Sequence, residues 1–298
     1  MKGFVIMNAY PAGEKFYRQS ERLTKALNEL GVQAETIKNG ELSVTLTADG
    51  RAETGKEAID FAVYFDKDKY LGRALENSGV RLFNKMNAIE LCDDKALTAL
   101  ALMGKGVRTV ETVPAPLCYT PNAVPSEAFL RKVETLGYPL VAKKSYGSFG
   151  AGVQLVKDEK ELLETEKEWL YQPHLYQRYV AESAGKDIRV IVIGGKAIAA
   201  IQRRAKAGEF RSNIELGGSG EKITLKKEYA EAAERCALAL GLDYCGVDLL
   251  EAKDGPVVCE VNSNAFFEGL EAATGIDVAA AYAKHIVKEM TKIKESIA

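Results

Sequence analysis

Two carboxylates and an amide near the end of the sequence could together hold a divalent cation. Asp248 stands in the segment GVDLLEA, and Glu260 and Asn262 stand in PVVCEVN. Both segments are apolar and β-branched, and the turn pair Asp254-Gly255 predicts a hairpin in which the two carboxylates lie opposite, or within one residue of opposite, each other, with Asn262 on the same face. Such carboxylates repel unless a cation lies between them, and oxygen ligands without His or Cys suit Mg²⁺ or Mn²⁺. The alternative is a set of outward-facing charges on a half-exposed hairpin.

A glycine-rich loop earlier in the chain could bind an anion. The strand-like residues 138–142 run directly into KKSYGSFGAGV, residues 143–153. Backbone N–H groups can converge on a phosphate in such a loop because glycine has no Cβ, and Lys143 would add a fixed positive charge. The loop matches neither the P-loop nor the Rossmann pattern, since the strand-like VQLV follows it. An ordinary glycine-rich hairpin is the alternative.

A third candidate group is cationic. Arg203, Arg204 and Arg211 cluster in QRRAKAGEFRSN, at the end of one expected strand and in the loop beyond it. Arginine binds phosphate and carboxylate through two parallel hydrogen bonds, so the cluster could hold an acidic substrate. Asn213 and the pair Gly217-Gly218 favour a shaped loop, whereas a run of basic residues is more often a solvated face.

Composition limits the classes of protein that these residues could serve. The chain has 298 residues, of which 47% are hydrophobic and 28% charged, so we expect a soluble globular protein with two or three packed units. A formal net charge of -2 favours neither nucleic acid nor membrane as a partner, and no apolar run is long enough to span a bilayer. The N-terminus reads as a first strand and not as a signal peptide, and five scattered cysteines suit a reduced, cytoplasmic protein. Only two histidines are present, so the chain has few candidate residues for a zinc site or a histidine-based catalytic triad.

The segments around these residues alternate between strand and helix patterns. Residues 1–87 predict a small parallel α/β unit, with strands at 3–10, 32–39 and 61–65 and helices at 15–31 and 69–79. One helix is expected over 87–106, capped by Asn87, and a proline-containing linker over 112–125. Later helices are expected at 126–136, 157–170, 227–240 and after Asp277, and later strands at 177–180, 186–195, 196–205, 244–252 and 256–262.

The order of these motifs resembles the ATP-grasp superfamily and, within it, the RimK-like α-L-glutamate ligases. The motifs run from Asp94-Lys95, through Lys143 before GSFGAG, YQRYV, GKDIRV and QRRAKAGEFRSN, to Asp248, Glu260 and Asn262. The likeness covers about residues 85–285 and is dense toward the end, where EVNSNAFFEGLEAATGID resembles the family's C-terminal signature. It implies an α/β fold, α+β in its C-terminal half, with an N-terminal α/β domain (1–87), a central ATP-grasp subdomain with a glycine-rich flap (88–176) and a C-terminal subdomain with a metal site (177–298).

The resemblance also implies a nucleotide site. Lys95 and Lys143 would contact the phosphates of ATP, and the glycine loop, including Gly147, would form a mobile flap over them. Arg178 and Tyr179 would lie at the hinge between subdomains, where backbone groups read the adenine edge. The family often has glutamate in place of Arg178, which leaves the side-chain contact at that position open.

The remaining implied roles concern the ribose, the reaction centre and the metals. Asp187 would hold the ribose, Arg203 and Arg211 would steady the transferred phosphoryl group, and Asn213 would lie nearby on the nucleotide. The three oxygen-bearing residues of the hairpin would hold two Mg²⁺ or Mn²⁺ ions. After that hairpin the family usually has serine-proline-glycine, whereas this chain has Asn264-Ala265-Phe266. Donor and acceptor identity are therefore open.

The implied activity is amide or peptide bond formation driven by ATP. A carboxylate would be phosphorylated and then attacked by an amine, with glutamate or a similar amino acid joined to a peptide, protein tail or metabolite, in an enzyme that forms homodimers or homotetramers. Such chemistry needs positioning and charge neutralisation more than a side-chain nucleophile, which agrees with the scarcity of histidine. Two alternatives remain: a small-molecule kinase on the same fold, and a nucleotide-binding regulatory module without turnover.

Overall fold

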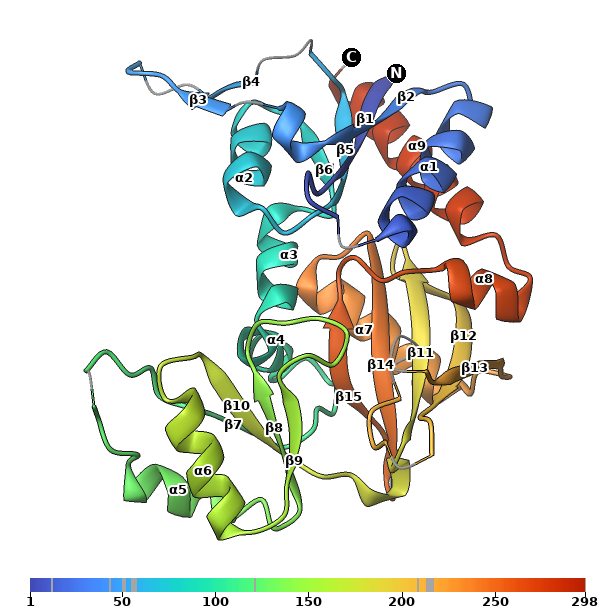
Figure 1. Ribbon diagram of the computed structural model, residues 1–298. Coiled ribbons are helices and arrows are strands. Elements are labelled where there is room, and N and C mark those ends of the chain that lie inside the picture. Colours follow the sequence, from blue (N-terminus) through green and yellow to red (C-terminus); the bar gives the residue numbers. More distant parts are fainter. Residues whose placement is uncertain are drawn as a thin grey trace.

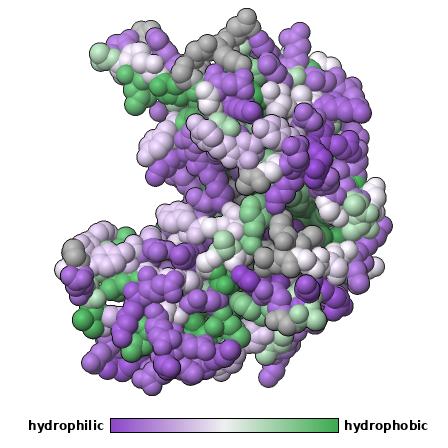
Figure 2. Space-filling view, in the orientation of Figure 1, coloured by the Kyte–Doolittle hydropathy of each residue, from purple (hydrophilic) through white to green (hydrophobic). Residues whose placement is uncertain are grey.

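The computed structural model describes residues 1–11, 13–42, 44–49, 52–54, 58–120, 122–207, 209–212 and 217–297. A parallel sheet with its helices forms the upper part of the view in Figure 1, a small antiparallel sheet lies at the lower left, and a larger antiparallel sheet lies at the lower right. The surface is hollowed between the upper part and the small sheet (Figure 2). No helix within the described ranges combines the length and the apolar character that crossing a membrane requires.

The N-terminal unit confirms the predicted α/β rhythm. Its parallel sheet has the order β2-β1-β5-β6, built from β1 (Lys2–Met7), β2 (Gln33–Lys38), β5 (Phe61–Phe65) and β6 (Arg81–Phe83). Helices α1 (Glu14–Glu29) and α2 (Lys69–Asn77) connect these strands, and α2 begins at Asp68, whose carboxylate caps two amides of the first turn. A short 3-10 helix η1 (Asn39–Glu41) and a small hairpin of β3 (Val44–Leu46) and β4 (Ala52–Thr54) stand beside the sheet.

The central sheet is antiparallel, with the order β7-β10-β8-β9. Its strands are β7 (Thr112–Pro114), β8 (Leu140–Lys144), β9 (Val153–Val156) and β10 (His174–Arg178). Helices α5 (Glu127–Glu134) and α6 (Glu159–Trp169) are each capped by a side chain, Ser126 and Asp158 respectively. The strand expected at 177–180 therefore begins and ends earlier, and residues 179–180 form the connection to the next sheet.

The C-terminal sheet is also antiparallel, with the order β13-β12-β11-β14-β15. Its strands are β11 (Lys186–Ile193), β12 (Lys196–Arg204), β13 (Ser219–Lys222), β14 (Tyr244–Ala252) and β15 (Gly255–Asn262), and η2 (Ala181–Ser183) precedes them. Strand side chains alternate between faces, so Val190 and Val192 pack toward α7 (Lys227–Leu240). Ile191 and Ile193 pack toward α8 (Glu268–Thr274) and α9 (Val278–Ile297) on the other face.

The prediction of a single helix over residues 87–106 is wrong. Two helices occupy this region, α3 (Met86–Asp93) and α4 (Lys95–Leu102), and Asp94 between them has extended dihedral angles. The Asp94 carboxylate accepts hydrogen bonds from the amides of Ala96 and Leu97, so it starts a new helix instead of continuing the old one. The expected cap at Asn87 is also wrong, because the helix begins one residue earlier and Lys85 precedes it.

The hairpin that carries the paired carboxylates forms, but its turn lies one residue earlier than predicted. Ala252 pairs with Gly255, so the turn consists of residues 253–254, and Gly255 takes the positive φ of 104° as the first residue of β15. The pairing register shifts by one residue after Asp248, which leaves Cys259 unpaired as a β-bulge. Because the bulge adds one residue to β15, it compensates for the earlier turn. Asp248 therefore lies directly opposite Glu260, as predicted.

The first and last helices of the fold share one core. Leu23 and Leu27 of α1 pack with Val278, Tyr282 and Ile286 of α9, together with inward residues of both the parallel sheet and the C-terminal sheet. In Figure 1 the blue α1 and the red α9 lie side by side at the upper right, and both ends of the chain are near the top. The predicted boundary near residue 87 therefore does not separate two independent cores, because α9 covers the N-terminal unit.

Candidate active site

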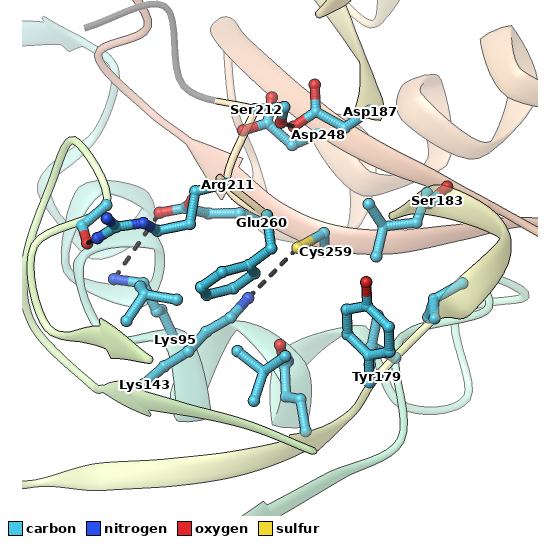
Figure 3. Close-up of a pocket in the computed structure, with 18 of the residues that line it drawn as sticks. Lys95, Lys143, Tyr179, Ser183, Asp187, Arg211, Ser212, Asp248, Cys259 and Glu260 are labelled. Atoms are coloured by element: carbon cyan, nitrogen blue, oxygen red, sulfur yellow. Dashed lines mark hydrogen bonds and ion pairs between the residues drawn. The ribbon is translucent and has the colours of Figure 1, made fainter. Parts of the chain in front are cut away.

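A cavity lies between the central sheet and the C-terminal sheet, beneath the loop that joins β8 to β9 (Figure 3). Most of the residues predicted to act on nucleotide or metal line it: Lys95, Lys143, Gly147, Arg178, Tyr179, Asp187, Arg203, Arg211, Asp248 and Glu260. Asn262 lines an adjoining cavity that also contains Glu260. Asn213 lies outside the residues that the structure describes.

The glycine loop is the predicted hairpin connection, and it folds over the cavity. Strands β8 and β9 pair antiparallel from Leu140–Val156 to Lys143–Val153, and the loop between them lines the cavity. Gly152 has a φ of 68°, and a Cβ there would come within 2.9 Å of the Lys144 side chain, so this turn requires glycine. Two predicted phosphate ligands hold the loop: Lys95 Nζ donates to the Gly147 carbonyl at 3.0 Å, and Arg211 Nη1 to the Gly150 carbonyl at 2.9 Å.

The two predicted phosphate lysines are held in the cavity wall. The Lys143 side chain is 7% exposed, and its Nζ lies 3.3 Å from the Cys259 Sγ, as the dashed line in Figure 3 marks. Lys95 Nζ lies 3.8 Å from Glu260 Oε1. Burial lowers the pKa of Lys95 most strongly; Glu260 opposes that change and the nearby Lys143 ammonium adds to it. Two buried ammonium groups in one wall favour an anionic ligand.

Asp248 is the centre of a buried network of charges. Its carboxylate accepts two hydrogen bonds from Arg189 at 2.7 Å each and one from Arg203 Nη2 at 2.8 Å. Arg203 also makes two hydrogen bonds, of 2.7 and 2.5 Å, to Asp187, which accepts a further bond from the Ser212 hydroxyl at 2.6 Å. Burial alone would raise the pKa of Asp248, but Arg189 and Arg203 outweigh it and the pKa is lowered. The network holds Arg203 rigidly in the cavity wall.

The Asp187 carboxylate is not turned outward in this structure. Both of its oxygens are bonded within the protein, to Arg203 and Ser212, so its geometry is that of a residue that positions an arginine. The ribose contact implied by the resemblance stays a prediction. Arg178 is likewise engaged elsewhere: its guanidinium bonds Glu111 at 2.8 Å and the Leu136 carbonyl at 2.7 Å. The main chain of Arg178 and the neighbouring Tyr179 line the cavity, and their contacts with the adenine edge stay predictions.

The oxygen donors fit a hard divalent cation. No three His, Cys, Asp or Glu side chains come together as a metal site in the part of the chain that the structure describes, so amide or ligand oxygens must complete one. The Asn262 side-chain nitrogen is buried without a hydrogen-bond partner, which marks this amide as a group that awaits a ligand. The amide can present its oxygen instead, and Asp248 Oδ1 keeps a lone pair beside the bond from Arg189, so the chemistry of these groups and of Glu260 fits a hard divalent cation, and their role as metal ligands stays a prediction.

Several residues of the site were missed from the sequence. Arg189 is a charged residue inside the apolar strand KDIRVIVIGG, and that contrast was a usable signal. Ser212 and Phe210 belong to the loop after β12, and neither residue type in that loop carried a signal. Cys259 enters the cavity because of the bulge, which no pattern in the sequence indicates.

The whole architecture occurs in a solved enzyme structure. D-alanine–D-alanine ligase from Bacillus anthracis, complexed with ATP, superimposes with a TM-score of 0.73 over 100% of both chains at 20% sequence identity. At this identity the likeness concerns the fold. The chain therefore has the fold of this class of ligase.

Sequence comparisons identify the family. The model of the RimK-like ATP-grasp domain matches residues 92–286. A probable alpha-L-glutamate ligase of Thioalkalivibrio sulfidiphilus is 40% identical over 209 residues, which are 70% of this chain and 67% of that protein. N-acetylaspartylglutamate synthase A of Homo sapiens is 37% identical over 219 residues, which are 73% of this chain but only 55% of the human protein. The chain belongs to the RimK-like ATP-grasp family.

Proposed function

We propose that this protein uses ATP to phosphorylate a carboxylate and then joins the acyl group to an amine, adding glutamate or a similar amino acid to a peptide, protein or small-molecule acceptor. Among the charged residues that line one cavity, four cations and two carboxylates carry the proposal. The cations are Lys95, Lys143, Arg203 and Arg211, and the carboxylates are Asp248 and Glu260. The names of the two relatives, a probable alpha-L-glutamate ligase and an N-acetylaspartylglutamate synthase, support glutamate as the first amino acid to test.

The lysine pair and the flap would bind the phosphates. Lys95 and Arg211 hold flap carbonyls at Gly147 and Gly150, so an incoming triphosphate would take over these cations and allow the flap amides to reorganise around it. Tyr179, at the connection after β10, would lie at the base end of the nucleotide. The predicted contacts of Asn213 and Asp187 belong to the same proposal.

Asp248, Glu260 and Asn262 would hold the metal, which neutralises phosphate charge when bound. Mg²⁺ or Mn²⁺ suits their oxygens, and the expectation of two ions is part of the proposal. Arg189 keeps Asp248 ionised and fixed, with its two hydrogen bonds of 2.7 Å, so the carboxylate oxygens are oriented before any cation arrives.

The covalent chemistry needs no nucleophilic side chain. A carboxylate oxygen of the substrate attacks the γ-phosphorus, the bond to ADP breaks, and an acyl phosphate forms. The amine nitrogen then attacks the acyl carbon, inorganic phosphate leaves with the bonding electron pair, and the surplus proton passes to solvent. Arg203 is positioned by two carboxylates to steady the negative charge on the phosphoryl group, and Arg211 faces the same cavity from the flap side. A closed flap would exclude water, which would otherwise hydrolyse the acyl phosphate.

The test is hydroxamate formation. The purified protein is incubated with ATP, Mg²⁺, a panel of carboxylic acids and hydroxylamine as the amine, and hydroxamate and phosphate are measured in parallel. A ligase produces both in equal amounts with the correct acid. A stable phosphorylated product without free phosphate would instead indicate a kinase, and the absence of turnover with every acid would contradict the ligase proposal.

Matched variants connect the activity to the cavity. Lys143→Met and Glu260→Ala each remove a charge from the proposed phosphoryl site, and we expect losses in kcat of roughly 10²–10³-fold. Lys157→Met and Glu221→Ala remove the same charges from exposed positions and should leave kcat unchanged. Near-normal rates in both cavity variants would refute the assignments. Gel filtration with light scattering tests the expected dimer or tetramer, and the expected cytoplasmic location is part of the same proposal.

A further inference from the structure

Two connected cavities extend from the reaction centre toward the N-terminal unit. The first, which we call the inner chamber, is lined by Glu260, Asn262 and Arg189. The second, which we call the outer chamber, has a volume of about 320 Å³, at the lower end of the range of small-molecule sites. Ser148, Phe149 and Phe266 line both chambers, so the two chambers adjoin, and the proposal below takes them as one path.

The outer chamber lies where an open α/β sheet binds ligands. Strand β2 pairs on one side of β1 and strand β5 on the other, which makes the gap between β1 and β5 the topological switch point of this sheet. Met7 and Asn8 at the carboxyl end of β1, and Phe65 and Asp66 at the carboxyl end of β5, line the chamber. This end of the parallel sheet therefore opens toward the phosphoryl site.

Four phenylalanine rings line the outer chamber, beside polar side chains such as those of Asn8, Gln19 and Asn264. Phe16 from α1, Phe149 from the flap and Phe266 from the segment after β15 form a cluster, with centroid distances of 5.0 to 6.4 Å. Lys15 Nζ lies 3.7, 4.8 and 5.8 Å from the ring centroids of Phe149, Phe266 and Phe16, so cation–π contacts hold all three rings together. Lys15 is not among the residues that line the chamber. Phe65 adds a fourth ring. A wall of this kind binds an apolar, planar group better than a charged one.

Phe149 holds an unusual backbone conformation for a bulky side chain. Its φ is 58°, in the left-handed region that favours glycine, and such strain is often found at functional sites. Phe149 lines the cavity proposed to bind the nucleotide, and it also lines both chambers. Because Phe149 belongs to the flap, closure of the flap over ATP also completes the wall of the outer chamber.

The charges along the path suit an acid whose carboxylate points inward. Arg189 and Lys67 line the inner chamber beside the proposed metal ligands. The one carboxylate of the outer chamber, that of Asp66, is already satisfied by the amides of Asn8 and Asn39, at 3.0 and 2.9 Å. Lys67 also lines the outer chamber but is paired with Asp93, whereas Arg189 lines the inner chamber alone. A carboxylate would thus be attracted to the inner chamber, while the outer chamber offers its phenylalanine rings to the rest of the molecule.

We propose that the outer chamber binds an aromatic group of the carboxylate substrate, and that Phe16, Phe149 and Phe266 determine this preference. The substrate class is an aromatic carboxylic acid, including an N-acylated aromatic amino acid or a peptide that ends in one. The inference rests on the proposed ligase function, because the carboxylate must reach the phosphoryl site through the inner chamber.

Paired substrates test the preference. The full-length protein is assayed with ATP, Mg²⁺ and hydroxylamine, using N-acetyl-L-phenylalanine and N-acetylglycine as acids, and kcat/KM is measured for each. We expect the aromatic acid to be favoured by about 10–200-fold, the range that an apolar pocket gives for one additional apolar group. Phe266→Ala should reduce this ratio at least 5-fold, whereas Tyr70→Ala, which truncates an exposed ring outside the chamber, should not change it. Thermal midpoints of both variants show whether they fold.

Binding without turnover separates the two hypotheses. The thermal midpoint is measured with ADP and Mg²⁺, with and without each acid. If small and aromatic acids are activated equally, or if Phe266→Ala folds and keeps the ratio, the chamber assignment is wrong while the ligase stands. If no acid is activated but the aromatic acid alone raises the midpoint, and Phe266→Ala abolishes that shift, the chamber assignment stands and the ligase does not. If the acid neither reacts nor raises the midpoint, the chamber assignment is overturned.

Discussion

Replacing Arg189 by methionine should destabilise the fold, because the buried Asp248 carboxylate would lose one of its two arginine partners. The Asp248 carboxylate is 3% exposed and loses two hydrogen bonds of 2.7 Å in this variant, and only the bond from Arg203 at 2.8 Å remains. Removing one partner of a buried pair costs about 3–5 kcal/mol, and we expect the lower end, about 3 kcal/mol, because Arg203 stays. For a chain of this size that corresponds to a fall in the thermal midpoint of about 5–10 °C.

The pH dependence of this loss follows from the lowered pKa of Asp248. A carboxylate whose pKa is lower in the folded state stabilises the protein above its unfolded pKa, and that stabilisation is lost as the pH falls through the folded value. Without Arg189 the folded pKa rises, so the deficit of the variant is complete at neutral pH and shrinks as the pH approaches about 4. Urea denaturation at several pH values measures this trend.

Two controls decide whether the uncompensated charge of Asp248 causes the loss of stability in Arg189→Met. Arg73 makes the same two-bond contact with Glu90, at 3.0 Å each, on a half-exposed surface, so Arg73→Met should cost only about 0–1 kcal/mol. In an Asp248→Asn background the orphaned charge is absent, and Arg189→Met should cost much less than in the wild type. A loss below about 1 kcal/mol, or one that is the same in both backgrounds, would refute the reasoning.

Three further predictions concern other parts of the molecule. Burial lowers the pKa of Lys95 below 10.5, so ATP binding at pH 9–10 should be accompanied by proton uptake that Lys95→Met reduces; calorimetry in two buffers measures it, and equal uptake in both proteins would contradict the assignment. Gly152→Val should destabilise the protein more than Gly31→Val, because both have positive φ but only the Cβ at 152 meets a side chain within 3 Å, and urea unfolding compares them. Tyr176→Phe removes the 2.7 Å hydrogen bond to the buried Glu166 and should cost about 1.5–3 kcal/mol by the same method, whereas a loss under about 0.5 kcal/mol would show that the bond contributes little.

Local rules predicted the main components of the site. The turn pair Asp254-Gly255 placed Asp248 and Glu260 opposite, or within one residue of opposite, each other, and the glycine content of residues 147–152 predicted a loop between two strands. The position of that loop over the site was implied by the resemblance alone. The helix–strand rhythm of the first 87 residues predicted the parallel sheet in the same way. These features depend on neighbours in sequence, so the sequence carries them directly.

Features that depend on tertiary contacts were not predictable in this way. The bulge at Cys259 adds one residue to a strand whose apolar pattern looks continuous, and the break at Asp94 depends on one carboxylate competing for backbone amides. The bonds of Asp187 with Arg203 and Ser212 join residues that are 16 and 25 positions apart, and the resemblance gave the carboxylate a contact with the ribose instead. The packing of the strands decides which buried charges pair with each other. The spacing of residues along the sequence does not encode that packing.

The shared core of α1 and α9 has a consequence for synthesis on the ribosome. The apolar face formed by Leu23, Leu27 and the parallel sheet emerges early, but Tyr282 and Ile286, which cover it, are translated about 200 residues after the last strand of that sheet. The early segment must therefore wait with uncovered apolar surface, where chaperones or aggregation compete for it. Nascent chains stalled before residue 278 should remain sensitive to protease in their first 87 residues, and release of the finished chain should remove that sensitivity.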